Sequence, residues 1–223
     1  MVKLITPLII HTIFRHNRIH HKVTIMYTYR IEQAIKAASV LHQDQLRKGS
    51  VPIPYITHLI ATMLILHDYT DDENALVAVL LHDTLENTDY TIEELTEDFG
   101  KEVATLVSTV TEITHEGEVK LPWLDVKKNY AKRLRKGPIE AVMIAAADKS
   151  HNFRSTVDEY FTDHNRFLKD FGPNLDARLE AYQSIANAIN SRLSDGIVHE
   201  FNHTFKEYKN FIYDVQKTLE KID

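Results

Sequence analysis

Apolar residues recur at intervals of three and four along most of this 223-residue chain. The first such run begins at Ile31, and the last extends from Val198 to Ile222. This spacing places apolar side chains on one face of an α-helix. Six glycines and six prolines are few for this length, and no segment shows the alternation typical of a β-strand. We therefore predict an all-α protein, a helical bundle with additional C-terminal helices.

The chain divides into three segments. Residues 1–25 contain an apolar stretch too short to span a bilayer and no signal-peptide cleavage site, so we expect a poorly ordered extension before a native start at Met26. Residues 26–195 are predicted to form the helical domain. Residues 196–223 have the pattern of an amphipathic helix, which we expect to pack on that domain or on a second copy in a homodimer.

Composition excludes several classes of function. The net charge of −6 and the pI of about 6.1 argue against binding to polymeric nucleic acid or to an anionic membrane. An anionic small molecule remains compatible, because the charge at one site can oppose the overall sign. The absence of cysteine rules out disulfides, thiolate metal sites and a cysteine nucleophile, and it fits a reducing cytoplasm.

Helix boundaries follow from capping residues and from breaks in the periodicity. One helix is expected from Thr28 to about Lys48, and another is expected to be capped by Thr57. A single helix is expected from about Asp72 to Asn87. The other assignments are a polar loop at 115–121, an apolar helix at 139–147 ending in Asp148, and an irregular connection at 156–173.

An imidazole and a carboxylate stand side by side after an apolar run, at His82 and Asp83. A buried carboxylate needs a metal, a cationic neighbour or exposure to solvent. The alternative to a metal site is a purely structural hydrogen bond between these two buried side chains. Asp148 also follows an apolar run, whose small residues 145–147 let helices approach closely. His58 stands in the first turn of an apolar helix. Taken alone it is interpreted as a structural histidine, although its position would also suit a metal ligand.

Together, these candidates give two imidazoles and two carboxylates. Such a mixed nitrogen and oxygen set suits Mn²⁺, Fe²⁺, Zn²⁺ or a similar ion. An ion of this kind can bind a phosphate oxygen as a Lewis acid and can lower the pKa of its bound water to supply a nucleophile. The pattern therefore predicts a site for one divalent metal ion.

Three stretches in order carry a resemblance to a known family. They are HQDQLRKGSVPIPYITHL, LLHDTLENTDYTIEELTEDFGKEVATLVSTVTE and AADKSHNFRS, within residues 28–156. Their combined order resembles the HD-domain metal-dependent phosphohydrolases. The resemblance is closest to the branch that contains the hydrolase domain of the RelA/SpoT alarmone enzymes and the small stand-alone hydrolases. It implies a cytoplasmic phosphohydrolase with an HD-domain helical bundle.

The resemblance also assigns roles to individual residues. It implies that His58, His82, Asp83 and Asp148 ligate one ion, commonly manganese in the alarmone branch. It implies that Glu86, with the residue after it, orients or deprotonates the attacking water.

The implied substrate is a phosphorylated nucleotide. Arg47 and Lys48 would flank its base, and Asn152 and Ser155 would hold its ribose-phosphate side. Hydrolysis of the 3′-pyrophosphate of (p)ppGpp is the first candidate reaction. No synthetase domain is expected within this chain, because about 70 helical residues follow the third motif.

This chain departs from the family at Asn87, where the alarmone hydrolases usually have Asp. An amide can hold a water but cannot act as a carboxylate base. Two alternatives therefore stand beside (p)ppGpp hydrolysis. One is a phosphatase for a nucleoside monophosphate or another small phosphoester, and the other is a catalytically attenuated, metal-binding nucleotide sensor.

Overall fold

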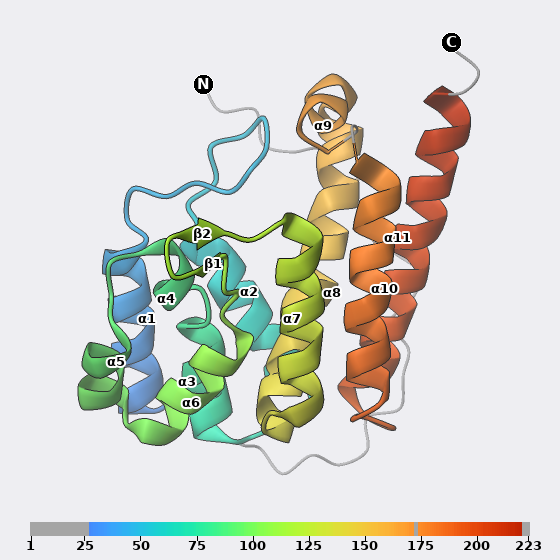
Figure 1. Cartoon of the computed structure of the whole chain (residues 1–223). Helices are drawn as coiled ribbons and strands as arrows, with labels where there is room; N and C mark the ends of the chain where they lie inside the picture. The colour runs from blue at the N-terminus through green and yellow to red at the C-terminus, as the bar shows by residue number, and fades with distance from the viewer. Residues whose placement is uncertain (1–26, 172–173, 220–223) are drawn as a thin grey trace.

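The computed structural model describes residues 27–171 and 174–219, so the extension predicted at 1–25 lies outside the described residues. The described chain is a bundle of helices with one short hairpin (Figure 1). Its elements, in chain order, are α1 (Tyr29–Leu41), α2 (Ile56–His67), α3 (Glu73–Leu80), α4 (Thr84–Asn87), α5 (Ile92–Phe99), α6 (Lys101–Val110), β1 (His115–Glu116), β2 (Val119–Lys120), α7 (Trp123–Lys136), α8 (Ile139–Thr162), α9 (His164–Phe171), α10 (Leu175–Asn190) and α11 (Ile197–Leu219). The predicted all-α class is confirmed.

Two helices form the centre of the core. Every residue from Ala75 to Leu81 is buried, so α3 has apolar neighbours on all sides. The longer α8 contacts α2, α3, α6, α9, α10 and α11. Figure 1 shows α10 and α11 beside α8 on one side of the molecule, with α1 and α5 on the other. Among the described helices, none is both long and apolar enough to cross a membrane.

The C-terminal helix α11 packs on this chain's own α8. Its buried face includes Phe201, Phe205 and Tyr208, and Phe153 of α8 stacks on Phe205 and Tyr208 at ring-centroid distances of 5.3 and 4.7 Å. Each aromatic side chain fully buried in this way contributes about 1.5–3 kcal/mol through lost apolar surface. Packing within the chain was one of the two arrangements predicted for this helix.

The single helix predicted from Asp72 to Asn87 is wrong. Helix α3 ends at Leu80, α4 begins at Thr84, and His82 and Asp83 lie in the turn between them. The Nδ1 atom of His82 lies 2.7 Å from the carbonyl oxygen of Val79, the group that a continuing helix would offer to the N–H of Asp83. The break turns both side chains away from the helix face that their spacing suggests.

The helix predicted to run from Thr28 to Lys48 ends early. Thr28 does cap it, but α1 stops at Leu41. The chain then turns back, because Leu46 and Pro54 form an isolated β-bridge and the N–H of Arg47 bonds the carbonyl of Ile53 at 2.9 Å. Residues 42–55, called the basic loop below, therefore present Arg47 and Lys48 from a loop and not from a helix end.

Four other assignments also differ from the structure. Helix α8 continues past Asp148 to Thr162, so α8 and α9 together occupy most of the segment expected to be irregular, and Phe167 of α9 is fully buried. Thr57 does not cap α2, since its hydroxyl donates to the carbonyl of Pro54 at 2.7 Å. The polar loop at 115–121 contains the β1–β2 hairpin, with Gly117 at a φ of 60° in its turn.

Candidate metal centre and substrate pocket

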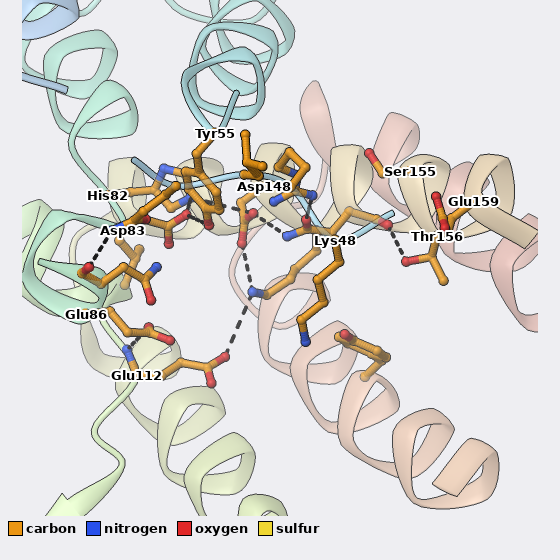
Figure 2. Close-up of a pocket in the computed structure, with 18 of the residues that line it drawn as sticks. Lys48, Tyr55, His82, Asp83, Glu86, Glu112, Asp148, Ser155, Thr156 and Glu159 are labelled. Carbon is orange, nitrogen blue, oxygen red and sulfur yellow. Dashed lines mark hydrogen bonds and ion pairs between the residues drawn. The ribbon is translucent and has the colours of Figure 1, made fainter. Parts of the chain in front are cut away.

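A pocket of about 560 Å³ opens where the basic loop, the α3–α4 turn, α7, α8 and α10 meet (Figure 2). Its lining includes every residue predicted for the site except His58, which lies behind His82 and the two carboxylates. Segments separated by more than 100 residues in sequence thus form one cavity. The structure thus brings the predicted residues together, while their individual roles stay predictions and several of the elements that carry them differ from those expected.

The two imidazoles and two carboxylates converge at one end of the pocket. His58 Nε2 lies 3.2 Å from Asp148 Oδ1 and 3.6 Å from Asp83 Oδ2. His82 Nε2 lies 3.3 Å from Asp83 Oδ2 and 3.6 Å from Asp148 Oδ1. His58, His82 and Asp148 are at most 5% exposed, and one candidate ligand atom from each lies within 4.8 Å of the others. We call these four residues the His/Asp cluster.

The tautomer of His82 fits a metal ligand. Because a carbonyl oxygen accepts only, the bond to Val79 places a proton on Nδ1 of His82. Its Nε2 is buried, faces the cluster and has no hydrogen-bond partner among the described residues. A neutral imidazole with this tautomer presents a lone pair to the cluster, which is the form that binds a cation.

The charges of the His/Asp cluster also favour a positive charge between its carboxylates. Burial lowers the pKa of His82, but the charges of Asp83 and Asp148 and the hydrogen bond to the Val79 carbonyl outweigh it and raise the pKa to about 9. Burial raises the pKa of Asp148. The Lys149 ammonium and both imidazoles outweigh that effect and hold the pKa of Asp148 well below its usual range. The cluster therefore stabilises a proton or a divalent cation among its carboxylates.

Neighbouring side chains fix the orientation of these groups. The Tyr55 hydroxyl donates to Asp83 Oδ2 at 2.6 Å, and the Tyr55 ring stacks on His42. His58 Nδ1 lies 2.9 Å from His151 Nδ1. Burial, with the nearby His58 and Arg47, lowers the pKa of His151 to about 3, so this ring stays neutral and can accept a hydrogen bond from the Nδ1–H of His58. Such outer partners set the tautomer of a ligating histidine.

Asn152 links the cluster to the basic loop. Its amide nitrogen donates to Asp148 Oδ1 at 2.5 Å, and its amide oxygen accepts from Arg47 at 2.9 Å. The Arg47 guanidinium also lies 5.4 Å from the centre of the Tyr55 ring. The roles predicted for Asn152 and Ser155 in holding the ribose-phosphate side stay predictions. The structure adds that Asn152 connects a candidate ligand to a candidate substrate contact.

Glu86 and Asn87 lie on the pocket wall beside the cluster. Glu86 Oε2 accepts the backbone N–H of Glu112 at 3.0 Å, and Gln45 of the basic loop donates to the Asn87 carbonyl at 2.7 Å. Although the Glu86 side chain reaches solvent, desolvation by surrounding protein and then the charge of Glu112 raise its pKa. A carboxyl group with a raised pKa is better suited to accept a proton near neutral pH.

Several charged or aromatic residues that line this pocket lie outside the predicted site. They are Glu112, Lys127, Lys149, Glu159, Arg178 and Tyr182. Lys149 lies inside the third quoted motif, directly after Asp148, so its position was a usable signal. Arg178 and Tyr182 lie on α10, and only the packing of α10 against α7 and α8 brings them to the pocket.

Known proteins are similar to this chain over the helices that surround the His/Asp cluster. Residues 34–169 match the HD domain family. The chain is 36% identical over 132 residues to the Escherichia coli K12 bifunctional (p)ppGpp synthase/hydrolase SpoT, an alignment that covers 56% of this chain and 18% of SpoT. It is 29% identical over 215 residues to the guanosine-3′,5′-bis(diphosphate) 3′-pyrophosphohydrolase of Borreliella burgdorferi, covering 90% of this chain and 31% of that protein. The chain thus spans less than a third of either relative.

Two solved structures have the same fold. A metazoan orthologue of SpoT that hydrolyses ppGpp superposes with a TM-score of 0.66 and 24% identity, over 81% of this chain and 96% of that one. A Listeria monocytogenes EGD-e protein superposes with a TM-score of 0.57 and 28% identity, over 70% and 97%. The family match covers more than half of the chain and includes the helices that carry the His/Asp cluster. This chain therefore belongs to the HD domain family.

Proposed function

We propose that this protein is a metal-dependent phosphohydrolase that acts on a phosphorylated nucleotide. The observation that carries the proposal is the His/Asp cluster, placed at one end of a pocket whose other walls carry Arg47, Lys48, Lys127 and Arg178. A cation-binding end suits the phosphate that is cut. Within this cationic wall, Lys127 and Arg178 suit the remaining phosphates, since charge-assisted hydrogen bonds to phosphate are stronger than neutral ones, while Arg47 and Lys48 are left for the base.

Residues of this chain have distinct parts in the proposed reaction. His58, His82, Asp83 and Asp148 would hold one divalent ion, with Mn²⁺ the first candidate. When bound, such an ion polarises a phosphate oxygen and makes its water acidic. Glu86 would accept a proton from the attacking water as the new bond to phosphorus forms, and it could return that proton to the leaving oxygen as the old bond breaks. Asn87 can orient the water but cannot take its proton.

The first candidate substrate is (p)ppGpp, with cleavage of its 3′-pyrophosphate. Support comes from the names of the E. coli and B. burgdorferi relatives and from a pocket large enough for a nucleotide. Arg47 and Lys48 would contact the base, and Asn152 and Ser155 the ribose-phosphate side. The sensor alternative is favoured by Asn87, since the pocket wall has an amide where a second carboxylate would assist turnover.

A metal-reconstitution screen tests the proposal. The purified protein is stripped of metal, reloaded with Mn²⁺, Fe²⁺ or Zn²⁺, and incubated with ppGpp, pppGpp, GDP, GMP and AMP. We expect GDP and pyrophosphate from ppGpp, resolved by anion-exchange chromatography. Release of phosphate from monophosphates alone would favour the second phosphatase. Bound metal with ligand-induced thermal stabilisation but no product would favour the sensor, and failure to bind any of the three ions would overturn all three functions.

A further inference from the structure

Lys149 is a buried lysine that the proposed reaction does not use. It follows Asp148 on α8, is 8% exposed and lies on the pocket wall. Adjacent residues of a helix point about 100° apart and do not normally face each other. The Lys149 side chain nevertheless folds back until its Nζ lies 2.7 Å from Asp148 Oδ2. A long cationic side chain has thus been brought to one oxygen of its own neighbour.

The two oxygens of Asp148 have different partners. Oδ1 lies 3.2 and 3.6 Å from the Nε2 atoms of His58 and His82, and it also accepts the Asn152 amide. Oδ2 is bonded to Lys149. One oxygen therefore faces the His/Asp cluster, while the other is held on the opposite side.

The Lys149 ammonium is itself fixed by a second set of contacts. Its Nζ lies 4.0 Å from Glu112 Oε1 and 5.2 Å from the centre of the Tyr130 ring. Lys127 bonds both carboxylate oxygens of Glu112, at 2.5 and 2.6 Å. Figure 2 shows Glu112 below Asp148 in the view. The Lys149 ammonium is within 4.0 Å of both carboxylates, so it bridges them. Negative and positive groups alternate from Asp148 to Lys127, so each buried charge has an opposite neighbour.

This arrangement is poorly explained by stability alone. Replacing a buried ion pair by apolar side chains of similar volume is often neutral or stabilising. A buried lysine beside a pocket, bonded to the unused oxygen of a candidate metal ligand, fits a role at the site better.

We propose that Lys149 is a positioning residue that restricts Asp148 to one-oxygen ligation. The proposal rests on the metal site of the proposed function. Lys149 holds Oδ2 away from the cluster, so that Asp148 offers only Oδ1 to a bound cation. Catalytic metal sites keep a coordination position open for water or substrate. Without Lys149, Oδ2 is free to turn inward and occupy that position.

The number of exchangeable waters on bound Mn²⁺ tests this role directly. It is measured by water-proton relaxation on the full chain loaded with Mn²⁺, together with Mn²⁺ affinity from electron paramagnetic resonance. In Lys149→Met we expect one exchangeable water fewer than in the unmodified protein. We also expect kcat to fall about 10–100-fold, the usual effect of losing an outer partner of a metal ligand, while KM stays within about twofold.

Two variants serve as controls. Lys149→Arg keeps a cation that can reach Oδ2, so it should restore both the water count and most of kcat. Lys128→Met makes the same substitution at a surface lysine of α7 that pairs with Glu180, so it should change neither measurement. If circular dichroism shows that Lys149→Met does not fold, Lys149→Gln replaces it, because the shorter amide does not reach Oδ2.

These measurements distinguish a failure of the role of Lys149 from a failure of the metal site. An unchanged water count and an unchanged kcat in the folded Lys149 variant would overturn the role of Lys149 and leave the metal site standing. If the unmodified protein binds no Mn²⁺, both the metal site and the role of Lys149 are overturned.

Discussion

The two ends of the pocket are built in different ways. The His/Asp cluster is supplied by α2, the α3–α4 turn and α8, and three of its four residues are at most 5% exposed. The opposite end is formed by the basic loop and α10, where Lys48 is exposed and Arg47 half-buried. Core packing thus fixes the groups proposed to act on the phosphate, while surface segments carry the groups proposed to bind the rest of the substrate.

This difference predicts that the two ends respond differently to mutation. Changes in the cluster should alter metal binding and kcat together, because the ligands share one ion and one set of buried neighbours. Changes in the basic loop should alter KM and leave metal binding intact. Asn152 and Tyr55 each contact Arg47 and a carboxylate of the cluster, so they are connections through which the separation could fail.

The largest effect is expected from Asp148→Asn. The amide keeps the shape of the side chain but loses the charge that attracts the cation. Mn²⁺ content, measured by mass spectrometry, should become negligible. The kcat should fall by more than the roughly 10²–10⁴-fold that a general base alone contributes, because the ion and its water are lost together. His199→Gln, at an exposed histidine paired with Asp195, is the matched control. Retention of metal and activity in Asp148→Asn would contradict the cluster as the metal site.

Glu86→Gln should reduce kcat by about 10²–10⁴-fold without loss of Mn²⁺. The pKa of Glu86 is raised by desolvation and by Glu112, so its basic form is lost at a higher pH than that of an ordinary glutamate. The kcat/KM of the unmodified protein should therefore fall with decreasing pH through that raised pKa, and Glu86→Gln should lack this acid limb. Glu93→Gln on exposed α5 is the control. An unchanged acid limb in the Glu86 variant would assign the proton to another group.

Arg47→Ala should raise KM about 10–100-fold, since a hydrogen bond to a charged group contributes about 1.5–3 kcal/mol. Mn²⁺ affinity and kcat should stay within a few-fold. Steady-state kinetics with the best substrate, beside Mn²⁺ titration, separates the two quantities. Arg135→Ala, an exposed arginine of α7, controls for loss of surface charge. Loss of Mn²⁺ binding in Arg47→Ala would show that Asn152 transmits changes in the loop to the cluster.

Asn87→Asp should increase kcat by about tenfold, less than the roughly 10²–10⁴-fold of a general base acting alone, because Glu86 already supplies one proton acceptor. The new carboxylate would stand beside Glu86 on the pocket wall. Single-turnover kinetics measures the chemical step without product release. Asn129→Asp on α7 adds the same charge away from the pocket lining. A decrease in kcat would indicate that the amide is already adapted to this substrate.

The smallest effect is expected from Gly49→Ala in the basic loop. Gly49 has a φ of 148°, and a Cβ there would come within 2.6 Å of Glu159 Oε2, whose other oxygen accepts the N–H of Ser50. The strain is about 1 kcal/mol, so KM should rise roughly fivefold while Mn²⁺ affinity is unchanged. Gly117→Ala, at another positive-φ glycine, strains the hairpin instead and should not change KM.

Local sequence was a good guide to the all-α class and to the residues of the cluster. An apolar run before His82 and Asp83, and another before Asp148, indicate that these polar side chains are buried. A buried charged group needs a partner. Local sequence was a poor guide to where helices end. The break at His82 depends on a side chain bonding the Val79 carbonyl, and spacing alone does not reveal that competition.

Only the tertiary structure decided which groups meet. His58 lies 90 residues from Asp148 in sequence, yet their ligand atoms are 3.2 Å apart because α2 packs on α8. Arg178 reaches the pocket only because α10 packs on α7, and no motif marks it. Spacing along a chain specifies the face of a helix on which a side chain lies. The partner of that face is set by how the helices pack, and that depends on the whole core.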